Sequence, residues 1–397
     1  MWCELEPTPR TPQNWPLRMG GPWQQMSAAE AQNLMESWRG PSVGSAITVD
    51  GVRLLAVTFF AHVRGASAVL LHLSNVTDRH RETLAPSLLY RVSDTDLFAG
   101  TFLLPADSIM SYRITDVSGL PDDVGRTRPG WVDIHRRGRP DPGNPLVMPT
   151  PLGGDSSIWM GPDARWRGWP THDVDGWVEV FGPRACGVLP GDERVVVLFD
   201  GQFLQHLTMG AALRGAGLGH TVVQIDCGTG DERAAALTSA DAAARTLRCG
   251  LDAAAMVLRA RVERAWAVAG QSFGGLAVAW LLAGRPDLVE RGLVQSGSLW
   301  HCSGGGGSMD QPGELVRGLR DGKGSVQRLT CIQVGREEDD MVQQARWYRD
   351  ALAARGATPD YLEVRGGHDY AWWRHGIVEA LSRWDADDSP SASAHTR

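Results

Sequence analysis

The pentapeptide at residues 270–274 reads Gly-Gln-Ser-Phe-Gly and places Ser272 between two glycines. The short apolar run 265–269 before it is typical of a buried strand, and residues 275–283 after it favour a helix. Strand, G-x-S-x-G and helix form the context of a nucleophile elbow, a tight turn that lifts a serine hydroxyl above a sheet. The alternative is an ordinary serine in a glycine-rich turn. We predict that Ser272 is a nucleophile.

A serine hydroxyl needs a base that takes its proton and an acid that orients the base. In hydrolases with this elbow, the acid follows the serine along the chain and a histidine follows the acid. A predicted strand at 361–364 is followed by Gly-Gly-His, so we expect His368 to be the base rather than a surface histidine. A predicted strand at 330–334 is followed by four consecutive acids, and we expect Glu338 to be the triad acid, with Asp339 as the alternative.

The negative charge of the reaction intermediate requires two backbone N–H groups, which form an oxyanion hole. One belongs to the residue after the nucleophile, which is Phe273. The other comes from the loop after an early strand. Residues 195–199 are predicted to be that strand, so Gln202 is the expected second donor.

These residues require a sheet that holds them. From residue 176 onward, apolar strands alternate with helical stretches such as 240–260 and 341–355, which predicts a mostly parallel sheet with helices on both faces. The fold class is therefore α/β, with an α/β-hydrolase catalytic domain at 176–384. Residues 385–397 are rich in Asp, Ser and Ala and are predicted to form a disordered tail.

The N-terminal part has a different pattern. Short β-rich runs separated by turn clusters predict an immunoglobulin-like β-sandwich domain within residues 1–150. A capping box predicts a helix from Ser27 to Trp38. Residues 117–172 are rich in Pro, Gly, Arg and Asp and predict a long ordered loop. The linker between the domains is placed at 151–175.

Composition excludes several function classes. The chain has 397 residues, a net charge of −7 and 21% charged residues, so it has no overall basic surface for nucleic acid. Its six cysteines lack metal-ligand or disulfide-framework spacing. Neither a signal peptide nor a stretch long enough to span a bilayer is evident. We expect a cytoplasmic protein without metal or other cofactor and without nucleic-acid or membrane partners; its oligomeric state is left open.

Several motifs resemble the enterochelin (enterobactin) esterase family, whose members hydrolyse the ester bonds of tri-catecholate trilactone siderophores. In the C-terminal half these motifs are Leu-Phe-Asp-Gly-Gln-Phe at 198–203, Gly-Gln-Ser-Phe-Gly-Gly at 270–275, Gln-Ser-Gly-Ser-Leu-Trp at 295–300 and Gly-Gly-His-Asp at 366–369. In the N-terminal half they are Val-Thr-Asp at 76–78, Thr-Asp-Leu-Phe at 95–98 and Asp-Pro-Gly-Asn-Pro at 141–145. The resemblance covers about residues 45–383. It implies a serine esterase that opens a small-molecule siderophore, iron-loaded or iron-free, so that iron can be released.

The resemblance also directs attention to aromatic residues near the predicted catalytic elements. Trp300 and Trp373 are expected to stack on aryl groups of the substrate, and Arg374 to bind an anionic ligand. The alternative is that the tryptophans pack between the domains. His301 departs from the family pattern, because a second aromatic is expected after Trp300. The glycine-rich loop 303–308 is either a lid or a plain connection.

Three functions remain open from the sequence. The first is hydrolysis of a siderophore trilactone. The second keeps the triad but acts on another ester or depsipeptide, or transfers the acyl group. The third is a binding protein on a hydrolase scaffold, because a fold alone does not establish an activity.

Overall fold

The computed structural model describes residues 17–79, 83–151, 153–170, 172–305, 307–326 and 329–388. The chain divides into two compact units. Residues up to 167, together with 365–372, form the first unit, and residues 168–364 with those from 373 onward form the second. The boundary at 167 lies within the linker expected at 151–175. The segment 365–372 joins the first unit although it follows most of the second in sequence.

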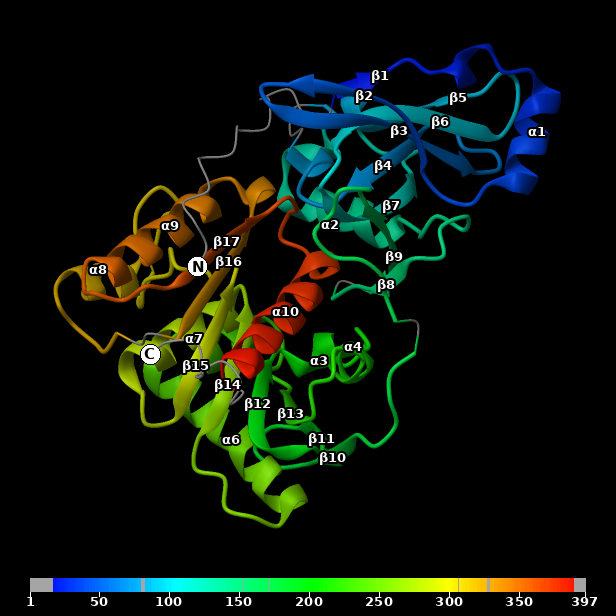
Figure 1. Cartoon of the computed structure of the whole chain (residues 1–397). Helices are drawn as coiled ribbons and strands as arrows, with labels where there is room; N and C mark the ends of the chain where they lie inside the picture. The colour runs from blue at the N-terminus through cyan, green and yellow to red at the C-terminus, as the bar shows by residue number, and fades with distance from the viewer. Residues whose placement is uncertain are drawn as a thin grey trace, which may run out of the picture. The chain divides into compact units, whose positions relative to one another are not determined.

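Antiparallel strands build the first unit (Figure 1). Their hydrogen-bonded order is β2-β3-β6-β5-β4-β7-β9-β8, and β1 pairs with β6. The strands are β1 (Leu17–Met19), β2 (Ser42–Val49), β3 (Val52–His62), β4 (Val69–Leu73), β5 (Leu88–Arg91), β6 (Leu97–Pro105), β7 (Ile109–Asp116), β8 (Val147–Pro149) and β9 (Asp155–Met160). The helices are α1 (Ala28–Ser37) and α2 (Arg128–Arg137), with 3₁₀ turns η1 (Pro22–Gln25), η2 (Thr77–Arg79), η3 (Ala85–Ser87) and η4 (Val124–Arg126).

One apolar core joins strands from both ends of this path. Phe59 on β3 packs edge-on against Phe102 on β6 and against Tyr112 on β7, with ring centroids 6.1 and 5.0 Å apart. Such aromatic pairs contribute beyond their buried area. The predicted N-terminal helix is confirmed: Ser27 Oγ accepts the backbone N–H of Glu30, and the Glu30 carboxylate accepts the N–H of Ser27 at 2.7 Å.

The prediction of a long loop at 117–172 is wrong in part, because α2, β8 and β9 lie within these residues. The polar residues that suggested a loop are paired inside the unit. Tyr112 donates its hydroxyl to Asp141 at 2.8 Å, and Asn144 donates to the Tyr112 hydroxyl at 3.0 Å. Trp38 donates its indole N–H to the same aspartate. Because these buried polar groups are hydrogen-bonded, a segment with few apolar residues can be part of the folded unit.

A mostly parallel sheet forms the second unit, in the order β10-β11-β13-β12-β14-β15-β16-β17. Strands β12 to β17 are the six strands that the sequence predicts, and they run parallel. Strands β10 and β11 add an antiparallel edge. The strands are β10 (Val178–Val180), β11 (Cys186–Leu189), β12 (Asp192–Phe199), β13 (His220–Ile225), β14 (Ala265–Gln271), β15 (Val289–Gln295), β16 (Thr330–Gly335) and β17 (Asp360–Val364). The helical elements are α3 (Gly201–Leu204), α4 (Met209–Gly215), α5 (Gly230–Leu237), α6 (Ala240–Leu258), α7 (Phe273–Gly284), α8 (Glu314–Arg320), η5 (Arg336–Glu338), α9 (Asp340–Ala353) and α10 (Tyr370–Asp388).

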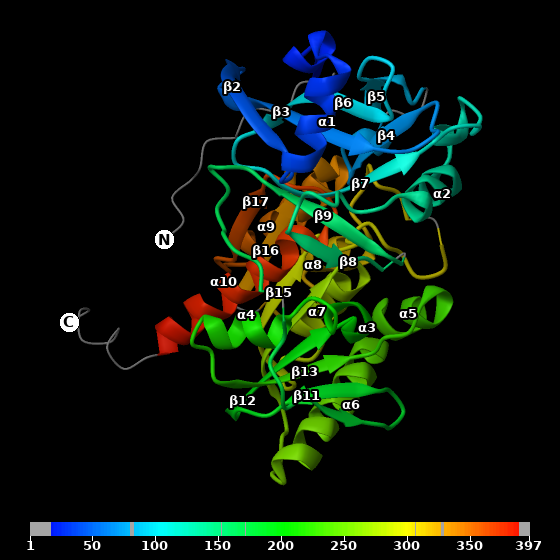
Figure 2. The same cartoon turned by 90° about the vertical axis from the view of Figure 1, so that its right-hand side faces the viewer.

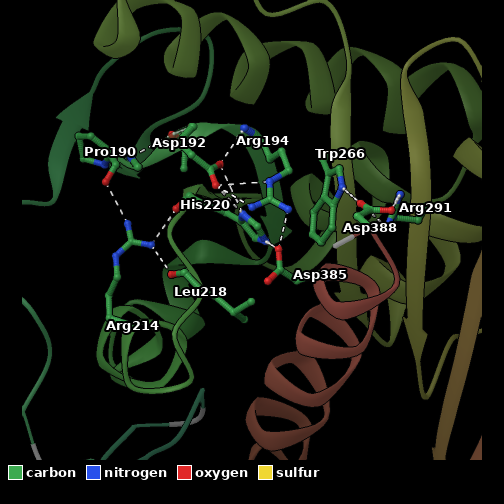
Figure 3. A network of polar contacts seen from close by, with 12 residues as sticks. Pro190, Asp192, Arg194, Arg214, Leu218, His220, Trp266, Arg291, Asp385 and Asp388 are labelled. Carbon is green, nitrogen blue, oxygen red and sulfur yellow. Dashed lines mark hydrogen bonds and ion pairs between the residues drawn. The ribbon is translucent and has the colours of Figure 1, made fainter. Parts of the chain in front are cut away.

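The last helix, α10, continues through Asp388, so the predicted tail is helical at its start, and residues 389–397 lie outside the described residues. Two carboxylates near the end of α10 bind the sheet (Figure 3). Asp385 accepts a hydrogen bond from Arg194 at 2.5 Å. Asp388 accepts one from the Trp266 indole at 2.9 Å and forms an ion pair with Arg291. These contacts hold α10 across three strands, β12, β14 and β15.

In the part of the chain that the structure describes, none of the helices combines the length and apolarity that a membrane crossing requires. The cytoplasmic location stays a prediction of the sequence.

Candidate active site

Ser272 lies on a strained turn between β14 and α7. Its backbone angles are φ 56° and ψ −118°, a region that residues with a side chain rarely adopt and that marks functional turns. The turn is so tight that a Cβ on Gly270 would lie 2.4 Å from the backbone of Gly274. The side chain of Ser272 is partly exposed although β14 is buried. This is the geometry of a nucleophile elbow.

The loop after β15 supports this elbow through backbone and side chain. The Ser272 N–H donates to Gln295 O at 3.1 Å, and the Ser298 N–H donates to Ser272 O at 3.0 Å. The two hydroxyl oxygens of Ser272 and Ser298 are 3.3 Å apart. The sequence analysis gave Ser298 no role. Its only signal was its place in the motif 295–300.

Glu338, the expected acid, lies at the end of the short turn η5 and is 6% exposed. Its Oε1 atom accepts the hydroxyl of Ser296 at 2.5 Å and the N–H of Gly335 at 2.8 Å. Ser296 in turn accepts the indole N–H of Trp373 at 3.0 Å. Two strand ends, β15 and β16, and helix α10 therefore fix this carboxylate.

The acids next to Glu338 differ in their burial. Glu337 is buried, at 1% exposure, whereas Asp339 and Asp340 are exposed. Asp339 has φ 50° and ψ −113°, so the turn between β16 and α9 is strained at this residue. The alternative triad acid thus stands next to Glu338 on a distorted backbone.

His368 lies in the segment 365–372, which the contacts assign to the first unit. Ile109 N–H donates to Arg365 O at 2.9 Å, and Ser111 N–H donates to the Asp369 carboxylate at 2.6 Å. Burial raises the pKa of Asp369, although hydrogen bonds from Ala371 and Ser111 and the nearby His368 oppose the change. The imidazole of His368 is partly exposed. Ser272 and Glu338 belong to the second unit, so the pairing of His368 with the serine stays a prediction.

Both expected oxyanion donors occupy helix starts in the second unit. Phe273 is the first residue of α7 and Gln202 the second residue of α3, where backbone N–H groups have no acceptor within the helix. The Gln202 side chain accepts the N–H of Cys227 at 3.0 Å and donates to Gly228 O at 2.7 Å. These bonds anchor α3 to the end of β13.

A buried ion pair, absent from the sequence analysis, joins these two helix starts. Asp200 precedes α3 in a left-handed conformation, with φ 62°, and is fully buried. Arg233 on α5 donates to both its carboxylate oxygens at 2.7 Å. The same guanidinium lies 3.4 Å from Gln271 O and 5.5 Å from the Phe273 ring centroid.

Three aromatic rings gather beside the elbow. Phe273, Trp300 and His301 have centroids 5.8 to 6.3 Å apart, and all three are partly exposed. Burial lowers the pKa of His301, although Glu314 opposes the shift, so the ring is neutral near pH 7. Trp300 therefore lies where the sequence analysis expects an aryl-binding ring. The expected loop 303–308 follows directly, and Gly306 in it lies outside the described residues.

Trp373 and Arg374 were expected to contact the substrate, but the structure places both side chains in the interior, at 2% and 1% exposure. Arg374 donates to the hydroxyl of Thr208 at 2.8 Å, and its guanidinium lies 3.5 Å from the ring centroid of Trp169. Burial lowers the pKa of Arg374 to about 9. These contacts give Arg374 a structural environment in which its charge meets an aromatic face.

A ladder of three glutamines crosses the sheet beneath the elbow. Gln271, Gln295 and Gln333 occupy paired positions on β14, β15 and β16, and each is at most 2% exposed. Gln271 donates to Gln295 at 2.7 Å, and Gln295 donates to Gln333 at 2.8 Å. The last two amides also donate to backbone oxygens of α10, at Trp373 and Gly376. The ladder therefore connects the strand that bears the nucleophile with α10.

A strained serine at the carboxyl edge of a largely parallel sheet, flanked by two helix starts, is the arrangement of a serine nucleophile in a hydrolase. Comparison with known proteins agrees. The family described as "Enterochelin esterase, N-terminal" matches residues 56–169, and the family described as "Putative esterase" matches residues 192–384. The chain belongs to the enterochelin esterase family.

Curated relatives carry the same description. An iron(III) enterobactin esterase of Escherichia coli is 28% identical over 79% of this chain and 85% of the relative. The iron(III) enterobactin esterase of Dickeya dadantii is 33% identical, over 32% of this chain and 31% of that protein. The alignment with the Dickeya protein thus spans less than two thirds of its length.

Solved structures agree on the fold. The ferric enterobactin esterase of Salmonella typhimurium has a TM-score of 0.76 at 22% identity, covering 89% of this chain and 99% of the other. The enterobactin esterase of Shigella flexneri, crystallised with enterobactin, has a TM-score of 0.74 at 24% identity, covering 91% and 98%. At these identities the likeness establishes the fold, which is mixed α/β with a β-rich N-terminal part.

Proposed function

We propose that this chain is a serine esterase that hydrolyses the ester bonds of a tri-catecholate trilactone siderophore, so that iron can be released from it. The observation that carries the proposal is the strained, partly exposed Ser272 at the carboxyl edge of the sheet. Family membership supplies the substrate class. We assign the second unit to the α/β-hydrolase fold and the first to an immunoglobulin-like sandwich, on the strand orders given above.

The proposed reaction follows the order of a serine hydrolase. Ser272 Oγ attacks the ester carbonyl carbon, and its proton passes to the imidazole of His368, which Glu338 orients. The negative oxygen accepts the N–H groups of Phe273 and Gln202. The imidazolium protonates the leaving alkoxide oxygen, and a water molecule then hydrolyses the acyl-enzyme.

One feature supports a catecholate substrate. Trp300 and its neighbouring rings offer aromatic faces beside the serine, and aryl groups stack on such faces. The contacts of the buried Trp373 and Arg374 support a role in positioning: Trp373 donates its indole N–H to Ser296, which holds Glu338, and Arg374 donates to Thr208. We therefore assign substrate contact to Trp300 and support of the site to the other two residues.

Product analysis tests the proposal. Purified full-length protein is incubated with ferric and iron-free trilactones, and mass spectrometry follows the linear trimer, dimer and monomer. Wild-type protein should release them, and the Ser272→Ala variant should not. Full activity of that variant would overturn the serine mechanism.

A second candidate keeps the triad but acts on another ester, or transfers the acyl group to an alcohol. Adding alcohols to the same assay separates hydrolysis from transfer, because transfer yields a new ester. A fluorophosphonate that labels wild-type protein but not Ser272→Ala would contradict a purely binding role.

A further inference from the structure

A cavity of about 340 Å³ lies in the second unit beside the predicted oxyanion loop. Its walls come from the segment before and within β10, from β11, from the start of α3 and from the end of β13. Figures 1 and 2 place α3 next to β13, with β10 and β11 at the outer edge of the sheet. The volume falls at the lower end of the range of small-molecule pockets, ~300–1,000 Å³. It accommodates one amino-acid side chain with part of its backbone.

Three carboxyl groups, those of Asp173, Glu179 and Asp226, line this cavity, and none of its described lining residues is a lysine or an arginine. The nearby Arg184 does not line the cavity; it donates to the backbone oxygen of Asp226 and forms an ion pair with Glu232. Burial, together with Cys249, Glu179 and Asp226, raises the pKa of the Cys186 thiol to about 12, although Arg184 opposes the shift. The cavity is therefore an electronegative site that favours a cation.

The carboxyl groups have different tasks. Asp173 accepts the N–H of Ala211 at 2.6 Å and the indole N–H of Trp177 at 3.1 Å, so it fixes a ring in the cavity wall. Asp226 accepts the N–H of Gly228 at 2.7 Å through one oxygen. Within the described residues, the side chain of Glu179 forms neither a hydrogen bond nor an ion pair. A cation here meets carboxylates and a tryptophan side chain in one cavity wall, and both kinds of group bind ammonium and guanidinium groups.

A buried amide adds a second requirement. Gln224 lines the same cavity at 4% exposure, and its side-chain nitrogen has no acceptor within the described residues. A buried N–H group without a partner is costly, so its presence in a cavity wall points to a ligand that brings an acceptor. A ligand that combines a cationic group with a carbonyl oxygen satisfies both the acids and this amide. An amino-acid residue with a basic side chain has this composition.

The cavity adjoins the reaction through Gln202, which lines it and is the proposed second oxyanion donor. An occupant of the cavity therefore contacts the residue whose backbone N–H is proposed to bind the ester oxygen. We propose that the cavity binds a basic amino-acid residue of the substrate itself, a lysine- or arginine-like spacer between the aryl group and the ester. This inference rests on the proposed function and narrows its substrate class to siderophores with cationic spacers.

Paired substrates test the inference. Two tri-catecholate triesters are made that differ only in the spacer, arginine in one and glycine in the other, and kcat/KM is measured for both. Wild-type protein should prefer the arginine substrate by ~10-fold or more, the usual effect of a charge-assisted contact. Glu179→Gln and Asp226→Asn should each lower this ratio toward one. Asp175→Asn removes the same charge from an exposed position outside the cavity and should leave the ratio unchanged.

The outcomes separate the inference from the function on which it rests. Hydrolysis of both substrates at equal kcat/KM, or a preference that neither cavity variant changes, would overturn the inference and leave the esterase intact. Calorimetry of both ligands with Ser272→Ala measures the same preference without turnover, so it decides the matter even if wild-type protein opens no trilactone. If free argininamide binds this variant as tightly as the arginine-containing ligand does, the cavity serves a separate cation, and the substrate assignment is wrong.

Discussion

Arg233 donates to both carboxylate oxygens of Asp200 at 2.7 Å. Asp200 begins the loop of one expected oxyanion donor, and the guanidinium of Arg233 lies over the ring of the other, Phe273. The planar guanidinium binds both carboxylate oxygens, so it fixes the relative orientation of the two side chains as well as their distance. The pair therefore determines how the starts of α3 and α7 approach each other.

Removal of this guanidinium should be strongly destabilising. Arg233→Ala leaves the fully buried Asp200 without its cation, and breaking a buried pair in this way costs about 3–5 kcal/mol of the free energy of unfolding. Urea denaturation measures the loss. The double variant Asp200→Asn/Arg233→Met should regain part of it. Arg245→Ala, at an exposed position on α6, should change the free energy of unfolding little. An equal loss in this control would contradict a specific contribution of the Arg233–Asp200 ion pair.

The proposed triad predicts a characteristic pattern of kinetics. Ser272→Ala and His368→Ala should each lower ester turnover by ~10³-fold or more, since the members of a triad act as a unit. For the same reason the double variant should be little worse than either single one. Rates with a chromogenic ester and with a trilactone check this. Losses that multiply in the double variant would contradict a shared step.

The acid is tested together with the hydroxyl that holds it. Glu338→Gln should lower kcat by ~10³-fold, and Ser296→Ala by ~10-fold, because Ser296 fixes Glu338 Oε1 at 2.5 Å. Adding Ser296→Ala to Glu338→Gln should not lower kcat any further. If the Ser296 hydroxyl acts through Glu338, the pH profile of kcat should shift in Ser296→Ala. Asp340→Asn, at an exposed neighbour, should have no effect. If Asp339→Asn is the damaging change, the acid is Asp339.

The glutamine ladder leaves no room for a side chain at Gly376 on α10. A Cβ on Gly376 would lie 2.1 Å from Gln333 Oε1 and 2.6 Å from Gln295 Nε2, so Gly376→Ala should lower the free energy of unfolding by ~1–3 kcal/mol. Adding Gln333→Ala should restore part of it. Gly318→Ala in α8, whose nearest neighbour would be 3.9 Å away, should be neutral or stabilising by up to ~1 kcal/mol. Thermal melting of the four proteins compares them.

Acid should weaken the carboxylate contacts of Asp192 and Asp388 shown in Figure 3. Burial raises the pKa values of Asp192 and Asp388, but hydrogen bonds from Arg194, and from Trp266 and Arg291, outweigh it and lower both. A carboxyl whose folded pKa lies below its unfolded value of ~3.9 stabilises the protein above that pH and loses this contribution as pH falls through the folded pKa. The free energy of unfolding should therefore drop below about pH 4. The drop should be smaller in Asp388→Asn than in Asp387→Asn, its exposed neighbour.

Much of the second unit could be predicted from the sequence because its buried strands are short apolar runs with clear ends. The serine elbow was predictable for the same reason, since glycines at 270 and 274 are required by contact distances that any such turn imposes. The edge strands β10 and β11 escaped notice, because Val178–Val180 is three residues long and mostly exposed. The cavity beside them was invisible for the same reason.

The rest depended on pairings that only the folded chain defines. Gln271, Gln295 and Gln333 are unremarkable in sequence, and they form a ladder because strand register places them side by side. Asp200 and Arg233 are 33 residues apart with no spacing that predicts a pair. Arg374 follows two tryptophans near His368, which suggested a ligand contact, but its helix turns it toward Trp169.

The contacts that fasten α10 also set an order of events during synthesis. Arg194 on β12 finds its partner Asp385 only after a further 191 residues have been made, and the Trp373 backbone that receives the glutamine ladder appears almost as late. The strands that carry Ser272 are thus complete long before their fastening exists. A ribosome-bound chain that stops short of α10 has a serine but no finished site.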